Sequence, residues 1–443
     1  MYTGLIEILG PGGKCALMSE ENKGRSLSPL EAFFLSFGGQ SPWISLIAFG
    51  TVALKLGGSF ISAAMLIATA LVMLNGLVVR SLASRFGKSG GYYVYALYSL
   101  SENMGFQTGW NYLLYSVAYG ATLLAGGVYV ITQIAKIQPI VSTLLLLVVA
   151  SSLALAGIRE SAKYAMGVGV LEITAIVGIS ILMLFRSHFP IVDPLSQVPR
   201  NPAAPILFAL GIPTGYGSLT SYAGEIKDSK RNVGKITVAV ILTGGLISTL
   251  FFYALTPFSP PSLVEFLGSD LIPYFWVFVL LLSVVDGILG GLAYMLATSR
   301  VLYIMSKDGH FHPFLAKVFQ GRPLAAEVLS VVAFWAVLLL GIRHLGVYLT
   351  FSSLAAVAGL TNLFIHFSSN FSLVRLASKR LRKRALELML AISALSLSGW
   401  VFIYSLSSVS KFTSDLVFGY IILGFLYAEV MEILGRSKGE TRD

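Results

Sequence analysis

Two acidic side chains lie deep inside apolar stretches of the sequence, Glu172 in "GVGVLEITAIVGI" and Asp286 in "SVVDGILGG". A charge within a membrane-spanning stretch is costly and usually serves a function. Because burial disfavours the charged form of a carboxyl group, Glu172 is a candidate proton carrier. The alternatives for Glu172 are a sodium ligand or a hydrogen-bonded structural acid. Asp286 is a candidate for binding an ion or a substrate's cationic group; the alternative is an aspartate that is satisfied locally or faces outer water.

The stretch "SFGGQSPW", residues 36–43, interrupts an apolar run with two glycines and a proline. Gly38 or Gly39 suits the left-handed position just after a helix. Ser41 suits an N-cap, and Pro42 suits the first residue of a new helix. Irregular backbone at membrane depth is tolerated only where it lines a cavity inside the protein. The stretch therefore predicts two half-helices that meet near the middle of the bilayer.

A second apolar run, "LFALGIPTGYGSLTSYAGE" (residues 207–225), repeats this pattern, with Ser218 as the predicted cap of its second half. Two interrupted spans at corresponding places in two halves of a chain indicate the binding site of a transporter. The alternative is a pair of kinked but continuous helices, since proline kinks are common in membrane helices.

Half-helix ends offer partners for charged groups without charged side chains. The free amides favour a carboxylate, and the free carbonyls accept hydrogen bonds from an ammonium group, so a zwitterionic amino acid fits both. The predicted substrate-binding residues are Gly38, Gly39, Gln40, Ser41, Thr214, Gly215, Tyr216 and Gly217, with Tyr115 as a further candidate for the wall of the site.

The elements that must position these residues are membrane helices. The chain has 443 residues, of which 56% are hydrophobic and 12% charged, and its mean hydropathy is +0.79. Apolar runs near the length that crosses a bilayer recur throughout, which excludes an ordinary soluble domain, and the short alternating segments of a β-barrel are not seen. An all-α membrane protein is predicted, with twelve spans at 29–54, 58–82, 106–135, 139–157, 164–186, 203–225, 235–257, 274–304, 326–344, 347–371, 387–406 and 413–434.

Loops rich in basic residues alternate along the chain with loops that have few, and this alternation predicts the orientation of the protein in the membrane. Of 31 lysines and arginines, one set of loops holds only Lys55, Lys136, Arg186, Arg200, Arg343 and Lys411. Cytoplasmic loops carry the excess of positive charge, so both termini are predicted to be cytoplasmic, as tails 1–28 and 435–443. This distribution accounts for the net charge of +10 without nucleic acid. The single cysteine, Cys15, allows no disulfide within the chain.

Four stretches together resemble the amino acid–polyamine–organocation superfamily. They are the first break, the loop "SRFGKSGGYYVYA" (84–96), the run "YAGEIKDSKRNVGK" and the segment "SRVLYIMSKDGHFHP" (299–313). The resemblance implies a five-plus-five inverted-repeat (LeuT-like) fold with broken first and sixth helices. The repeats would be 29–186 and 203–371, and the two further helices would lie within 387–434.

The resemblance also implies secondary transport of amino acids or related amines. Aligned on the family, Glu172 stands where some members carry a proton-titrating lysine, behind the first break. Gln40, Pro42, Gly217, Gly224 and Ser229 depart from the family's pattern, which leaves the substrate open.

The predicted function is therefore a permease that moves amino acids, with neutral ones weakly favoured, by proton coupling and alternating access. The alternatives are a cationic amino acid or polyamine transporter or exchanger, a sodium symporter, and, as a different class, a substrate sensor or channel. No HExxH or G-x-S-x-G motif is present, so no enzyme, metal or cofactor is expected. The expected partners are the substrate, protons or sodium, and the lipid bilayer; the oligomeric state is left open.

Overall fold

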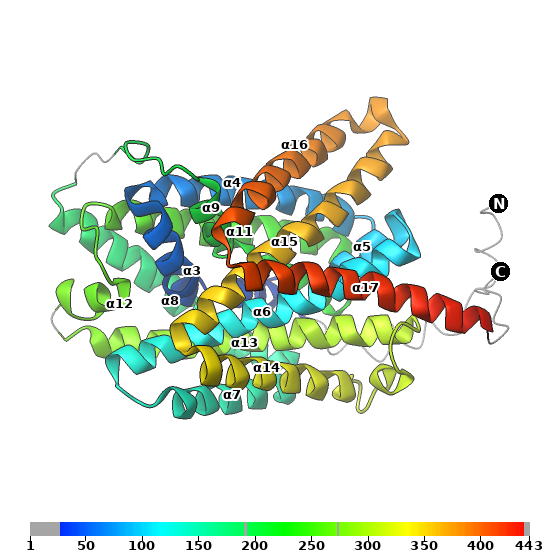
Figure 1. Ribbon diagram of the computed structural model, residues 1–443, viewed down its shortest axis with the longest axis horizontal. Helices are drawn as coiled ribbons and strands as arrows, with labels where there is room; N and C mark the ends of the chain where they lie inside the picture. The colour runs from blue at the N-terminus through cyan, green and yellow to red at the C-terminus, as the bar shows by residue number, and fades with distance from the viewer. Residues whose placement is uncertain (1–26, 190–192, 273, 438–443) are drawn as a thin grey trace.

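In the computed structural model the residues described, 27–189, 193–272 and 274–437, form helices and two isolated bridges but no strand (Figure 1). Residues 1–26 of the predicted N-terminal tail, with Cys15, and residues 438–443 of the predicted C-terminal tail lie outside them. The α-helices are α2 (Pro29–Gln40), α3 (Pro42–Gly57), α4 (Ile61–Ala83), α5 (Gly91–Ser99), α6 (Glu102–Ile134), α7 (Pro139–Ala156), α8 (Ile158–Arg186), α9 (Ala203–Leu210), α10 (Gly217–Ser221), α11 (Ser229–Leu255), α12 (Leu263–Glu265), α13 (Trp276–Lys307), α14 (Leu324–Leu345), α15 (Val347–Ser378), α16 (Leu381–Ser405) and α17 (Lys411–Ser437). Shorter turns are η1 (Gly58–Phe60), η2 (Pro213–Tyr216), η3 (Ala223–Glu225), η4 (Phe266–Asp270), η5 (Pro313–Ala316) and η6 (Leu406–Ser408).

Ten helical runs among the described residues are long and apolar enough to cross a membrane. The run Pro29–Ala83 contains the first two predicted spans, because the chain continues through α2, α3 and α4 with only short interruptions. The sixth predicted span, 203–225, divides into α9, η2, α10 and η3, each too short to count as a crossing helix. The all-helical class and a multi-pass membrane protein are thus confirmed.

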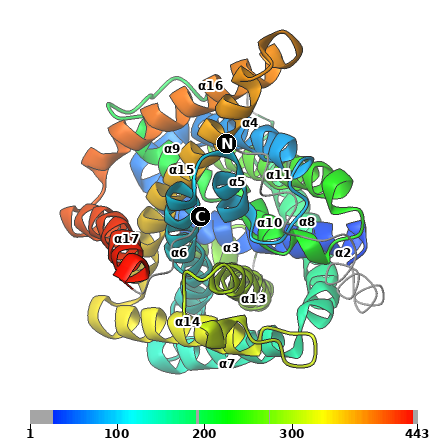
Figure 2. The ribbon, with the colours of Figure 1, turned by 90° about the vertical axis from the view of Figure 1, so that its right-hand side faces the viewer.

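The broken segments lie in the centre of the molecule and the C-terminal helices lie at its edge. Figure 2 shows α3 and α10 in the middle, with α16 and α17 on one side and α7 and α14 on another. In the most apolar 18 residues of α17 only 17% of the residues are buried, whereas in those of the run Pro29–Ala83 67% are buried. Exposed apolar side chains such as Leu386, Ile403 and Phe412 fit contact with lipid tails.

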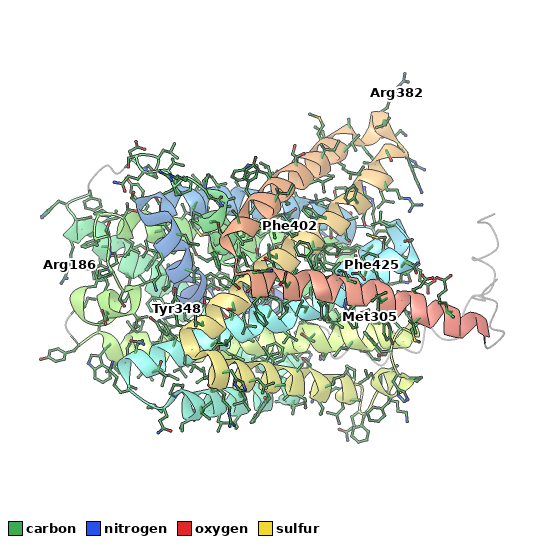
Figure 3. The ribbon with its side chains drawn as sticks, in the orientation of Figure 1. Arg186, Met305, Tyr348, Arg382, Phe402 and Phe425 are labelled. Atoms are coloured by element: carbon green, nitrogen blue, oxygen red, sulfur yellow. The ribbon has the colours of Figure 1, made fainter. Side chains whose placement is uncertain are left out.

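Two long helices, α6 and α13, pack against each other and position the site. Both contact α3, and α13 also contacts α2 and α8. Figure 3 shows Arg186, the last residue of α8, and Arg382, at the start of α16, at opposite ends of the molecule. Helices α7, α13, α14 and α17 run roughly along the long axis of the molecule (Figure 1).

Candidate transport site

The first break is a single left-handed residue between two helices. Helix α2 starts with a capping box of Ser28 and Glu31 and ends at Gln40, and α3 starts at Pro42. Ser41 between them has φ 40° and ψ 64°. The prediction that Gly38 or Gly39 takes the left-handed position is wrong, because both lie inside α2. The predicted break, with Pro42 as the first residue of a new helix, is confirmed.

Ser41 is the N-cap residue of α3, but its side chain does not cap that helix. Its hydroxyl instead donates to the carbonyl of Gly38 at 2.6 Å and to the backbone carbonyl of Asp286 at 3.1 Å. A left-handed backbone costs a non-glycine residue free energy, so such a residue persists only where its surroundings fix it. The two hydrogen bonds of the Ser41 side chain supply that fixation.

The two acids predicted from sequence as separate candidates meet at the start of α3. Glu172 Oε1, from α8, accepts a hydrogen bond from the amide of Trp43 at 2.8 Å. Asp286 Oδ2, from α13, accepts one from the amide of Ile44 at 2.8 Å. The first amides of a helix have no partner inside it, and they attract negative charge. The amides expected to receive a substrate carboxylate are therefore held by the protein's own acids in this conformation.

Glu172 and Asp286 thus accept from successive amides, and both side chains are fully buried. The remaining oxygens, Glu172 Oε2 and Asp286 Oδ1, receive no hydrogen bond from an N–H or O–H group of the described residues. Tyr164 of α8 lies beside the pair, since its hydroxyl donates to the carbonyl of Val285, the residue before Asp286, at 2.6 Å. The sequence placed each acid at depth in a separate span but contained no sign that the two side chains touch.

The second break is a tightened helix rather than an open gap. Gly211, Ile212 and Gly217 all keep right-handed helical backbone angles around the 3₁₀ turn η2. Ser218 lies within α10 instead of capping it, and its hydroxyl donates to the carbonyl of Gly215 at 3.0 Å. The prediction that Ser218 caps a separate half-helix is therefore wrong.

Side chains from other helices satisfy the carbonyls of this second break. Gln40 Nε2 donates to the carbonyl of Pro213 at 2.6 Å. The hydroxyls of Tyr119 and Tyr112, on α6, donate to the carbonyls of Gly211 (2.5 Å) and Gly217 (3.1 Å). In this conformation polar side chains therefore donate to the carbonyls that could accept hydrogen bonds from a substrate's ammonium group.

The two breaks are in direct backbone contact. A Cβ added to Gly39 would lie 2.8 Å from the carbonyl oxygen of Gly215, and a Cβ added to Gly215 would overlap the backbone of Gln40. Glycine is required at both positions because no side chain fits between the segments. The structure therefore brings together Gly39, Gln40 and Gly215, which the sequence predicted as parts of one site.

Tyrosines gather beside the second break. The hydroxyls of Tyr115 and Tyr294 lie 2.8 Å apart, and Tyr216 Oη lies 3.1 Å from Nε2 of His366. Tyr115 and Tyr216, predicted to line the site, both lie in this group, together with Tyr294, which the sequence did not single out. Its position on α13 facing α6 could be found only from the packing of these helices. Thr214, the remaining predicted binding residue, turns its hydroxyl back to the carbonyl of Leu210.

Comparison of the sequence with models of known protein families shows to which family this chain belongs. The model of the amino acid permease family matches residues 31–423. The chain belongs to the amino acid permease family. This membership confirms the superfamily resemblance drawn from the four stretches, and it makes the chain a membrane transporter rather than an enzyme.

Two curated relatives of this permease, both named low-affinity putrescine importer PlaP, come from Escherichia coli strains K12 and O157:H7. Each is 24% identical over 266 residues, which cover 54% of this chain and 58% of the importer. The crystal structure of a mutant manganese transporter from Eremococcus coleocola has a TM-score of 0.56 and 14% identity, and the match covers 96% of both chains. This likeness shows the fold alone. In the described part of the permease, no three His, Cys, Asp or Glu side chains gather as a metal site would need.

An ion-pair network closes one end of the permease's second break. Arg300 of α13 bonds to Glu225 of η3 at 3.0 Å and to Glu327 of α14 at 2.7 Å. Arg322 completes the network with Glu327 at 2.7 Å. Beside it, the amide of Leu27 donates to the carbonyl of Glu225 at 2.7 Å, which ties the start of the described chain to the end of the break.

Proposed function

We propose that this permease is a secondary active transporter that carries amino acids by alternating access and is coupled to protons through Glu172. The observation that carries the proposal is the meeting of a buried acid and two broken helices at one point. Glu172 holds the first amide of α3, while Gly39 and Gln40, just before it, touch Gly215 of the second break. A change in the protonation of Glu172 therefore acts directly on the backbone where we expect substrate to bind.

The proposed architecture has twelve crossings. The segments α2 to α8 form the first inverted repeat (29–186), and α9 to α15 form the second (203–371). Helices α16 and α17, in region 387–434, are additional and lie at the edge. Both termini are cytoplasmic. In this proposal the ion-pair network around Arg300 lies at the cytoplasmic end and is opened and closed during transport.

The proposed substrate site consists of Gly38, Gly39, Gln40, Ser41, Thr214, Gly215, Tyr216 and Gly217, with Tyr115 in its wall. An ammonium group would replace the Gln40 amide at the carbonyl of Pro213 or a tyrosine hydroxyl at a neighbouring carbonyl. A carboxylate would compete with Glu172 and Asp286 for the first amides of α3. We favour neutral amino acids, because in this conformation Asp286 is already engaged.

The second candidate is transport of a cationic amino acid or polyamine. Two observations favour it, namely the 24% identity to putrescine importers and the carboxyl group of Asp286 at the break. Sodium is the alternative coupling ion, because two carboxyl groups side by side also offer oxygen ligands to a metal cation.

The test is transport by the purified protein in liposomes. Counterflow with the twenty amino acids, putrescine and spermidine identifies the substrate without assuming any coupling ion. Positive substrates are then offered under an inward proton gradient and, separately, an inward sodium gradient. We expect neutral amino acids to exchange and the proton gradient to drive their accumulation. Exchange only of diamines would favour the second candidate, and accumulation driven only by sodium would refute proton coupling.

A further inference from the structure

We propose that Glu172 and Asp286 hold one proton between them and act as a single proton-binding site. Asp286 is then the second residue of the coupling device rather than a ligand for a cationic substrate. The transport meaning of this inference rests on the proposed function, but the site itself can be tested on the purified protein without any substrate.

The geometry of the pair points to a shared proton. Glu172 and Asp286 each use one oxygen to accept an amide of α3, from Trp43 and Ile44 respectively. Trp43 and Ile44 are successive residues, so the two carboxyl groups lie side by side, and their other oxygens, Glu172 Oε2 and Asp286 Oδ1, are buried without a hydrogen-bond donor among the described residues. Two ionised carboxylates have no hydrogen to donate to each other, so a hydrogen bond within the pair forms only when one of the two groups is protonated.

The described residues around the pair include no basic partner that would stabilise two ionised carboxylates. Within the described residues neither acid forms an ion pair, and the hydroxyls of Tyr164 and Tyr119 lie near the pair. Helices α2 and α3 carry Glu31 and Lys55, which lie in the first turn of α2 and the last turn of α3. Helix α7, packed against both α8 and α13, has no ionisable residue. The ionisable residues of two further neighbours lie near the ends of their helices: Lys230, Arg231, Lys235 and Tyr253 on α11, and Glu327, Arg343 and His344 on α14.

A single shared proton also leaves the pair with a net negative charge, which the N-terminus of α3 stabilises. Two carboxyl groups that share a proton have a net charge of about minus one, which the positive end of a helix stabilises. Two ionised carboxylates would face each other in a buried site and repel. Because they hold successive amides, the repulsion would act across the first turn of α3, next to the break at Ser41. Loss of the proton would then push α8 and α13 apart at the level of the break.

The amide variants Glu172→Gln and Asp286→Asn test this directly. In each, the new amide group can accept from α3 and donate N–H to the remaining acid, which replaces the shared proton. Thermal unfolding of the full-length protein in detergent is followed from about pH 5 to about pH 9. We expect wild type to lose stability as the pH rises and the shared proton is lost, and each variant to lose that pH-dependent step. Glu160→Gln, on the exposed part of the same helix α8, is the matched control and should keep the wild-type profile.

The outcomes separate this inference from the proposed function. If Asp286→Asn keeps the wild-type step while Glu172→Gln removes it, Glu172 acts alone and the shared site is refuted. If both variants remove the step but no proton gradient drives uptake by wild type, the shared site stands and proton-coupled transport fails.

A measurement on wild type alone covers the case in which a variant does not fold. Infrared difference spectra between low and high pH should contain the carbonyl band of a protonated carboxyl group that disappears on deprotonation. Its absence, in protein shown to be folded, would overturn the proposal.

Discussion

Replacing Gly39 by alanine should strongly reduce transport, because the added methyl group has no room between the two breaks. The new Cβ would lie 2.5 Å from Ser218 Oγ and 2.8 Å from the carbonyl oxygen of Gly215, where ordinary contacts begin near 3.4 Å. Gly215 cannot retreat freely, since it is itself packed against the backbone of Gln40. Overpacking of this kind costs about 1–3 kcal/mol. If that cost falls on the state in which the breaks touch, its population decreases by about 5- to 150-fold.

The assay is the initial rate of counterflow by purified Gly39→Ala in liposomes, at equal protein incorporation. Gly178→Ala is the matched control, because it adds the same methyl group to a membrane helix at a position with nothing within 4 Å. The double variant Gly39→Ala with Ser218→Gly removes one of the two clashes and should recover part of the rate. A single variant as active as wild type would refute the reasoning that the two breaks must touch during transport.

Two further predictions concern the ion-pair network and the wall of the site. Glu327→Gln leaves the buried guanidinium of Arg300 with Glu225 as its one remaining acidic partner, and breaking a buried pair costs up to about 3–5 kcal/mol, so thermal unfolding should shift clearly downward. Lys163→Met, which removes an exposed pair, should shift it little, and equal shifts would contradict the importance of burial. Tyr115→Phe removes the hydrogen bond to Tyr294, worth about 1 kcal/mol, and should weaken substrate binding by about fivefold in a competition assay. Unchanged affinity would remove Tyr115 from the wall.

Much of the fold could be predicted from the sequence, because the length and hydropathy of an apolar run identify a membrane helix. The structure places a helix or a broken helix within each predicted span. The first break was also predictable, since proline and paired glycines rarely occur together inside a membrane helix without a reason. The backbone detail was not. The Ser41 hydroxyl, at the left-handed position, bonds to the nearby carbonyl of Gly38 and to the distant carbonyl of Asp286, and no local pattern contains the second contact.

The candidate site was predictable in its parts but not in its pairing. The depth of Glu172 and of Asp286 follows from hydropathy alone. Their contact depends on how α8 and α13 are rotated against α3, which the packing of the whole bundle decides. For the same reason, the sequence predicted free amides at the start of α3, whereas the structure caps them with these acids. The requirement for glycine at Gly39 also has a different cause from the one predicted, since it comes from close packing and not from a left-handed backbone.

The most direct test of proton coupling through Glu172 compares two modes of transport in the same liposomes. Counterflow needs only substrate binding and alternation, whereas accumulation under an inward pH gradient also needs the coupled proton. The account predicts that Glu172→Gln keeps counterflow of the identified substrate but loses accumulation and the pH dependence of uptake. Accumulation by Glu172→Gln at the wild-type level would contradict it.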